Sequence, residues 1–143
     1  MSNYATTADL TTLIPTLTDH GETDFTDELT EATADVNREI EVEFIKRGFN
    51  FGDGNLRFDN DLLDGTQWKR ATMYRSLAYY IMPRLSPFKP DDSFQLQMKL
   101  YKELYAEEMA SEFARGIKYD GNNDGTYDEN SDYYEAPQDR LYR

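Results

Sequence analysis

The chain has no cysteine and one histidine, and these two shortages exclude much of the usual chemistry of protein sites. Without cysteine there is no disulfide, no thiol nucleophile and no cysteine-ligated metal. The single histidine, His20, stands in a polar turn beside Asp19 and Glu22, which is typical of an ordinary surface side chain. A histidine-based triad would have only this centre, and no Gly-x-Ser-x-Gly element accompanies it. The sequence therefore predicts a protein that is not an enzyme.

Basic residues are also scarce. Fifteen lysines and arginines stand against 28 acidic residues, and the formal net charge is −13. A surface of this sign repels nucleic acid and anionic membranes, so ordinary binding to a phosphate backbone is disfavoured. A negatively charged surface would also suit the inner wall of a channel through which DNA passes without binding.

Long apolar runs are missing as well. No stretch approaches the roughly 20 apolar residues that span a bilayer. The N-terminal residues MSNYATTADL have neither the basic nor the apolar region of a signal peptide. We therefore expect no membrane contact, and the lack of cysteine fits a cytoplasmic origin.

Enough apolar and aromatic material is present for one folded domain with a modest core. The 143 residues are 38% hydrophobic, and the aromatic residues are 11 tyrosines, 8 phenylalanines and one tryptophan. This content argues against general disorder, and the length suits a single domain.

Apolar residues recur every three or four positions in several segments, which predicts an all-α fold, a small bundle of about four helices. The predicted helices cover residues 4–18, 23–46, 66–82 and 90–115. Thr6 or Thr7 could cap the first helix, Pro83 and Pro87 should end the third, and Gly116 should stop the fourth.

The third predicted helix has the broadest apolar face, so we expect it at the centre of the bundle. The second helix, in contrast, has a clear polar side, and Glu31, Asp35, Arg38 and Glu39 are expected to face solvent.

The composition changes after Gly116, so we divide the chain into a helical domain at 1–116 and an acidic, aromatic-bearing C-terminal arm at 117–143. The arm is expected to be extended, with room for a short hairpin near 117–128. Its candidate partner-binding residues are Tyr127, Tyr133, Tyr134, Leu141, Tyr142 and Arg143. Such anchors either dock onto a neighbouring protein or pack back on their own domain.

A metal-like pattern opens this arm. Hard oxygen ligands recur as in the first part of an EF-hand calcium loop, at Asp120, Asn122, Asp124, Thr126 and Asp128. The pattern then fails, because Ser131 stands where a bidentate glutamate belongs. The same residues also favour a metal-free turn, since Asp, Asn and Gly are turn formers. A weakly bound calcium ion is therefore the one cofactor that the sequence suggests.

The sequence opens with Asn3-Tyr-Ala-Thr-Thr-Ala-Asp-Leu10. The helical body is followed by the run Arg115-Gly-Ile-Lys-Tyr-Asp-Gly-Asn-Asn-Asp-Gly125 and the polar arm. Together these features resemble the head–tail adaptor (connector) proteins of tailed bacteriophages. The resemblance covers most of the chain at the level of architecture. Sequence similarity is confined to the two ends.

The resemblance implies a viral structural protein of the virion neck, present in the host cytoplasm during assembly. Such adaptors form a ring, typically of about twelve subunits, beneath the portal. The expected partners are the portal protein, neighbouring copies of the chain and the next neck or tail protein. DNA would pass through the acidic lumen without specific binding, and the arm would dock onto the portal or an adjacent subunit.

Two other functions stay open at this point. One is a different phage neck or tail-completion protein, a class that tends to be richer in β-structure. The other is an acidic regulatory protein that binds calcium or mimics DNA, for which the net charge and the loop at 120–128 are the motivation.

Overall fold

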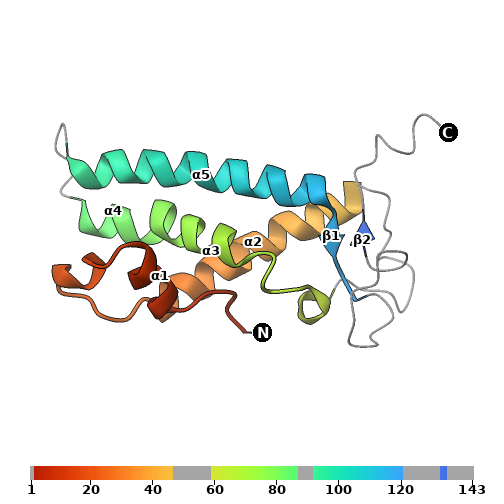
Figure 1. Cartoon of the computed structure of the whole chain (residues 1–143), viewed down its shortest axis with the longest axis horizontal. Helices are drawn as coiled ribbons and strands as arrows, with labels where there is room; N and C mark the ends of the chain where they lie inside the picture. The colour runs from red at the N-terminus through yellow and green to blue at the C-terminus, as the bar shows by residue number, and fades with distance from the viewer. Residues whose placement is uncertain (1, 47–58, 87–91, 121–132, 135–143) are drawn as a thin grey trace.

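The computed structural model of the chain describes residues 2–46, 59–86, 92–120 and 133–134. They form a mostly helical bundle, so the predicted all-α class is confirmed (Figure 1). The elements, in chain order, are α1 (Thr7–Leu13), the 3-10 turn η1 (Leu17–His20), α2 (Thr26–Lys46), the 3-10 turn η2 (Asn60–Leu62), α3 (Lys69–Ser76), the π-helical turn η3 (Leu77–Ile81), α4 (Met82–Leu85), α5 (Ser93–Arg115), and the short strands β1 (Ile117–Lys118) and β2 (Tyr133–Tyr134).

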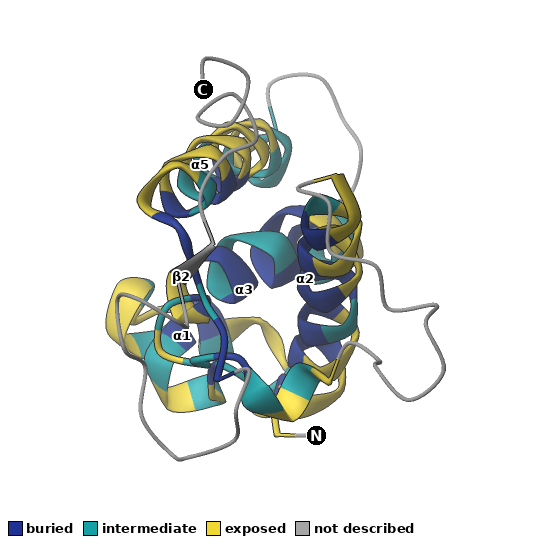
Figure 2. Ribbon diagram, turned by 90° about the vertical axis from the view of Figure 1, so that its right-hand side faces the viewer, coloured by how far each residue is buried: buried dark blue, intermediate teal, exposed yellow. Residues whose placement is uncertain are grey.

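The helix that runs from α3 through η3 into α4 lies at the centre of the bundle. α3 packs against both α2 and α5, and Figure 2 shows α3 between them, with α1 and α2 on opposite sides. Trp68 and Ala71 at the start of this helix are fully buried. The prediction of a central third helix is therefore confirmed.

The first helix is shorter than predicted. It begins with a capping box, in which the backbone N–H of Asp9 donates to the Thr6 hydroxyl at 3.2 Å and the Thr6 N–H donates to the Asp9 carboxylate at 2.8 Å. It ends at Leu13, and Ile14 is extended. Because a residue before proline is driven out of the α region, Pro15 stops the helix at this point, and the chain restarts as η1.

The prediction that Pro83 ends the third helix is wrong, because the helix continues to Leu85. The preceding turn is π-helical, and the N–H of Met82 donates to the carbonyl of Leu77, five residues back. Proline normally breaks a helix because it lacks an N–H and its ring collides with the carbonyl four residues earlier. The wider π turn shifts the hydrogen-bond register just ahead of the proline and relieves that conflict.

The core consists of two clusters of buried side chains along the bundle. The first joins α1, the start of α2, η3 and α4, and includes Leu10, Leu29, Leu77, Ile81 and Met82. The second joins the end of α2, the start of α3, the end of α5 and the chain after it, and includes Phe44, Trp68, Met109, Ile117 and Tyr119.

Ile117 and Tyr119 belong to this second cluster, and Asp120 beside them is also buried. Ile117 is fully buried, Tyr119 is 6% exposed and Asp120 is 5% exposed. The predicted boundary at 116 does mark the end of α5, but the first four residues of the predicted arm pack as part of the helical body. Residues 121–132 and 135–143 lie outside the described part of the chain.

The extended segment after Gly116 is paired on both sides. β1 pairs with β2 in antiparallel register, with Ile117 opposite Tyr134 and Lys118 opposite Tyr133. On the other side, the N–H of Asp64 donates to the carbonyl of Lys118 at 3.2 Å, and the N–H of Asp120 donates to the carbonyl of Leu62 at 2.9 Å. The partner of β1 therefore lies further along the chain than the predicted hairpin at 117–128.

Across the ranges that the structure describes, none of the helices has the length and apolar character needed to cross a bilayer.

Candidate functional site

The site residues predicted from the sequence are mostly outside the described ranges. This applies to the arm residues Tyr127, Leu141, Tyr142 and Arg143 and to the calcium-loop residues Asn122, Asp124, Thr126 and Asp128. Tyr133 and Tyr134 form β2, so their backbone pairs with their own chain. Docking of the arm onto a partner stays a prediction.

Asp120 is the one predicted calcium ligand that the structure describes. It lies at the edge of the second core cluster, 5% exposed. Within the described ranges, no three His, Cys, Asp or Glu side chains come together as a metal-binding group. Calorimetric titration with calcium would separate the metal site from the metal-free turn.

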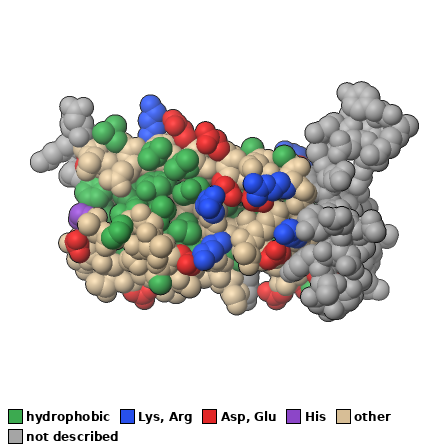
Figure 3. All heavy atoms as spheres, viewed as in Figure 1, with side chains coloured by type: hydrophobic (Ala, Val, Ile, Leu, Met, Phe, Trp, Pro, Cys, Tyr) green, Lys and Arg blue, Asp and Glu red, His purple; other side chains and the backbone are tan. Residues whose placement is uncertain are grey.

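A hollow of about 700 Å³ opens between α1, the start of α3, the end of α5 and β1. Figure 3 shows basic and acidic side chains gathered near the middle of this side of the molecule. Eight charged residues line the hollow, the bases Lys69, Arg70, Arg115 and Lys118 and the acids Asp9, Asp64, Glu108 and Glu112.

In two ion pairs of the hollow, the basic side chain is more exposed to solvent than its acidic partner. Lys69 contacts Asp9 at 3.0 Å, and the side chains are 47% and 25% exposed, respectively. Arg115 contacts Glu112 at 3.0 Å, with 71% and 8% exposed. The cation is the more exposed partner of each pair, while the hollow as a whole is lined by equal numbers of basic and acidic side chains.

Gln67 holds the chain after α5 against the start of α3. Its side-chain amide donates to the carbonyl of Gly116 at 2.9 Å and to the carboxylate of Glu112 at 3.2 Å. Its amide oxygen accepts from the backbone N–H of Lys118 at 3.0 Å. This one side chain therefore fixes the spacing of the residues that form the wall of the hollow.

Two carboxyl groups of the hollow have shifted pKa values. Burial and the negative charge of Glu112 raise the pKa of Glu108. Burial also acts to raise the pKa of Asp9, but hydrogen bonds from Lys69 and Thr6 outweigh it and hold that pKa below its ordinary value. Exposed ammonium and guanidinium groups over such carboxyls can bind carboxylates or other anions of a partner.

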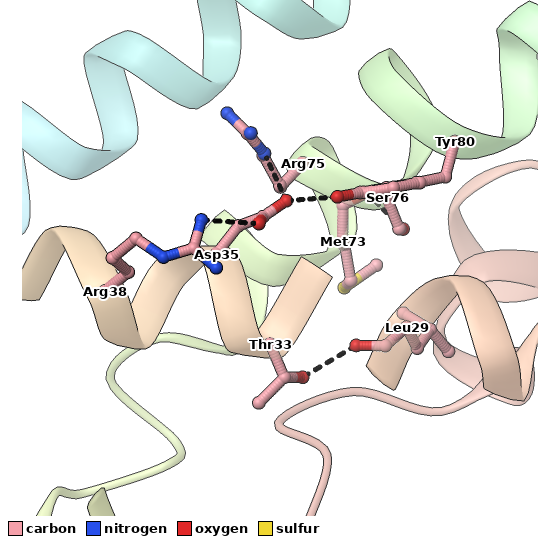
Figure 4. A network of polar contacts seen from close by, with 8 residues as sticks. All are labelled: Leu29, Thr33, Asp35, Arg38, Met73, Arg75, Ser76 and Tyr80. Carbon is pink, nitrogen blue, oxygen red and sulfur yellow. Dashed lines mark hydrogen bonds and ion pairs between the residues drawn. The ribbon is translucent and has the colours of Figure 1, made fainter. Parts of the chain in front are cut away.

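A second polar cluster joins α2 to the central helix. Asp35 accepts hydrogen bonds from Nε of Arg75 at 3.1 Å and from the hydroxyl of Tyr80, and it contacts Arg38 at 3.5 Å (Figure 4). The guanidinium of Arg75 lies 3.9 Å from the centroid of the Tyr79 ring, which adds a cation–π contact.

The prediction that Asp35 faces solvent is wrong, since the residue is 8% exposed. Arg75 and Tyr80 supply the hydrogen bonds that make a buried carboxylate tolerable. Burial and the hydrogen bond to Asp35 raise the pKa of Tyr80. This cluster therefore ties two helices together.

Exposed apolar side chains lie on two separate surfaces. Leu96 and Leu100 of α5 are 65% and 49% exposed, and Leu13 of α1 is 41% exposed and also lines the hollow. Figure 3 shows apolar side chains gathered over α5 and the helices beneath it. On α2, Val42 and Ile45 are 48% and 58% exposed. Large exposed apolar side chains in groups indicate surfaces that bind other proteins.

The sequence had no signal for the hollow, because its lining comes from three regions far apart in the chain, at residues 9–13, 64–74 and 108–118. Comparison with known proteins gives no significant match to a protein-family model, a curated protein or a solved structure. The function is therefore argued from the surfaces of the molecule.

Proposed function

We propose that the protein is a head–tail adaptor of a tailed bacteriophage. In this function it is one subunit of a ring, of about twelve copies, that links the portal to the next neck or tail protein. The proposal rests on the resemblance carried by the two ends of the sequence and on one structural observation, the uneven distribution of charge over the bundle.

The acidity of the described residues is concentrated on α2. This helix has seven acidic and two basic residues, whereas α5 has four acidic and three basic residues. Asp27, Glu31, Glu39 and Glu41 of α2 are exposed. The hollow on the opposite side of α3 presents Lys69 and Arg115 to solvent.

This distribution supports an assembly subunit in two ways. Since the most acidic helix lies on one side of the bundle, identical copies can associate head to tail, as in closed rings, without bringing two such helices together. An acidic ring also offers little attraction to a DNA backbone, so a genome could move through its lumen without binding. The helical fold also favours an adaptor over the neck and tail-completion proteins that are richer in β-structure.

The test is to mix the purified protein with the portal of the same phage and to examine the mixture by electron microscopy. We expect rings of the protein on the portal. Portals that remain bare, at protein concentrations well above those of the portal, would rule out the adaptor function.

A truncation tests the predicted arm separately. Removal of 135–143 leaves β2 and the residues 117–120 of the core intact, but it removes the predicted anchors Leu141, Tyr142 and Arg143. If the arm is the anchor, the truncated protein keeps its helical circular dichroism spectrum and loses its binding to the portal. A truncated form that binds normally would assign docking to the helical body.

A further inference from the structure

Two carboxyl groups of the hollow, those of Glu108 and Glu112, lie one turn apart on α5, and we call them the carboxyl pair. The four-residue spacing places their side chains on the same side of the helix, about 5–6 Å apart at Cβ, and the two groups are hydrogen-bonded to each other. The side chain of Glu112 is only 8% exposed. Two negative charges this close and partly removed from water repel each other, and a shared proton removes the repulsion.

The other charged groups of the hollow leave the carboxyl pair only partly neutralised. They are Asp9 of α1, Asp64, Lys69 and Arg70 in and before α3, Arg115 of α5 and Lys118 of β1. Lys69 pairs with Asp9 at 3.0 Å, and Lys118 lies 3.9 Å from Asp64. Burial and the charge of Glu112 outweigh the attraction of Arg70 and Arg115, so the pKa of Glu108 is raised.

Gln67 connects the carboxyl pair to the chain that follows α5. Its amide nitrogen donates to Glu112 at 3.2 Å and to the carbonyl of Gly116 at 2.9 Å, and its amide oxygen accepts from the N–H of Lys118 at 3.0 Å. Lys118 belongs to β1, the strand on which β2 pairs. An opening of this segment that breaks the Gln67 hydrogen bonds therefore also admits water to the pair.

We propose that the carboxyl pair is a proton-linked latch on the segment that follows α5. In the closed state the pair holds one proton between its two carboxyl groups, and in the open state the groups are hydrated and the proton leaves. Acidification therefore favours the closed segment and the pairing of β2 with β1, whereas loss of the proton favours opening. The inference concerns local stability and does not depend on the adaptor function.

The direction of the pH dependence follows from linkage. The closed state binds the proton of Glu108 at a higher pH than the open state does, since the closed pKa is raised above the ordinary value of 4.5. The free energy of opening is therefore largest below that value and falls as the pH rises through the closed pKa. Asp9 acts in a separate range, because its pKa is lowered from 3.8.

Amide hydrogen exchange in the full-length protein tests the latch, because the N–H of Lys118 donates to Gln67. Its protection factor is measured by NMR from about pH 5 to about pH 7 and divided by that of Ile40, a fully buried residue of α2. Unfolding of the whole bundle would change both amides alike, so the ratio isolates local opening. Glu108→Gln removes the titrating group, and Glu107→Gln, at an exposed position of the same helix, is the matched control.

We expect the ratio to fall as the pH rises in the wild type and in Glu107→Gln, by up to about tenfold for each unit by which the pKa of Glu108 is raised. In Glu108→Gln the ratio should not change with pH. A wild-type ratio without pH dependence would overturn the proposal, and so would an unchanged dependence in Glu108→Gln. Parallel changes at Lys118 and Ile40 would assign the proton to the stability of the whole fold and would refute a local latch.

An NMR titration of the side-chain carboxyl signals gives a check that needs no variant. Glu108 should titrate above its ordinary pKa of 4.5, and the signal of Glu112 should move in the same step, as expected of a coupled pair. If Glu108 titrates at or below its ordinary pKa, the latch is refuted even where Glu108→Gln fails to fold.

Discussion

Asp35 of α2 accepts a hydrogen bond from Nε of Arg75 of α3, and only 10% and 23% of the two side chains are exposed. Asp35→Ala would leave the guanidinium and the Tyr80 hydroxyl without this acceptor in a place that water reaches poorly. We expect a loss of about 2–3 kcal/mol in the free energy of unfolding, measured by urea denaturation.

Arg38 provides the matched control, because it contacts the same carboxylate with a side chain that is 73% exposed. Arg38→Ala should cost less than about 0.5 kcal/mol, as is usual for exposed ion pairs. Equal losses for Asp35→Ala and Arg38→Ala would contradict the assignment of Asp35 as the tie between α2 and α3.

Gly65 is packed directly against the ring of Tyr4. A Cβ atom at position 65 would lie 2.9 Å from Cδ1 of that ring, and the Tyr4 hydroxyl donates to Oδ1 of Asn37 on α2. Gly65→Ala should therefore displace the ring and cost about 1–3 kcal/mol of stability. In a Tyr4→Ala background the same substitution should cost much less, and thermal unfolding of the four proteins of this cycle measures the difference. An unchanged cost in both backgrounds would mean that the ring is not the obstacle.

Gln67 should stabilise the end of α5 and β1 together. Gln67→Ala removes the donor to Gly116 and the acceptor of the Lys118 N–H, and we expect a loss of about 1–3 kcal/mol. Amide hydrogen exchange should accelerate at Lys118. Gln67→Glu should be at least as harmful, since it places a second carboxylate beside the buried Glu112. A Glu variant as stable as the wild type would contradict these hydrogen bonds.

Asp9 should make a pH-dependent contribution to stability. Its pKa in the folded protein is lowered, because the hydrogen bonds from Lys69 and Thr6 outweigh the effect of burial. Ionised Asp9 therefore stabilises the fold above its ordinary pKa, and this contribution is lost as the pH falls through the folded pKa. The difference in unfolding free energy between the wild type and Asp9→Asn should be constant near neutral pH and shrink below about pH 4.

Lys69→Met tests the stated cause of this shift. Without the ammonium at 3.0 Å, the acid-dependent part of the effect of Asp9→Asn on the unfolding free energy should become smaller. If it keeps its full size in the Lys69→Met background, the capping hydrogen bonds with Thr6 alone account for the lowered pKa.

The long helices were predictable because several local signals agree there. The predicted helices at 23–46 and 90–115 correspond to α2 (Thr26–Lys46) and α5 (Ser93–Arg115), and Gly116 follows α5 with a φ of 99°. For α5, the apolar spacing, the capping residue Asp92 and the terminal glycine all mark the same limits. Of the two caps predicted for α1, Thr6 and Thr7, the structure has Thr6.

The predictions from the sequence failed where contacts between distant parts of the chain determine the structure. Asp35 has the sequence context of a surface acid, and only its contacts with Arg75 and Tyr80 explain its burial. Pro83 is normally a helix terminator, but a π turn precedes it here and the helix continues to Leu85. The hollow is likewise a product of tertiary structure, since α1, α3, α5 and β1 contribute to it.

The extended segment that follows Gly116 has a consequence for how copies of the protein can meet. An exposed strand edge is a template for unlimited edge-to-edge pairing and hence for aggregation. Here the backbone of Ile117 and Lys118 is occupied by Tyr133 and Tyr134 on one side and by Asp64 and the Gln67 side chain on the other. Strand exchange through β1 is therefore blocked in the folded chain, and growth of an assembly at this segment would require β2 to leave first.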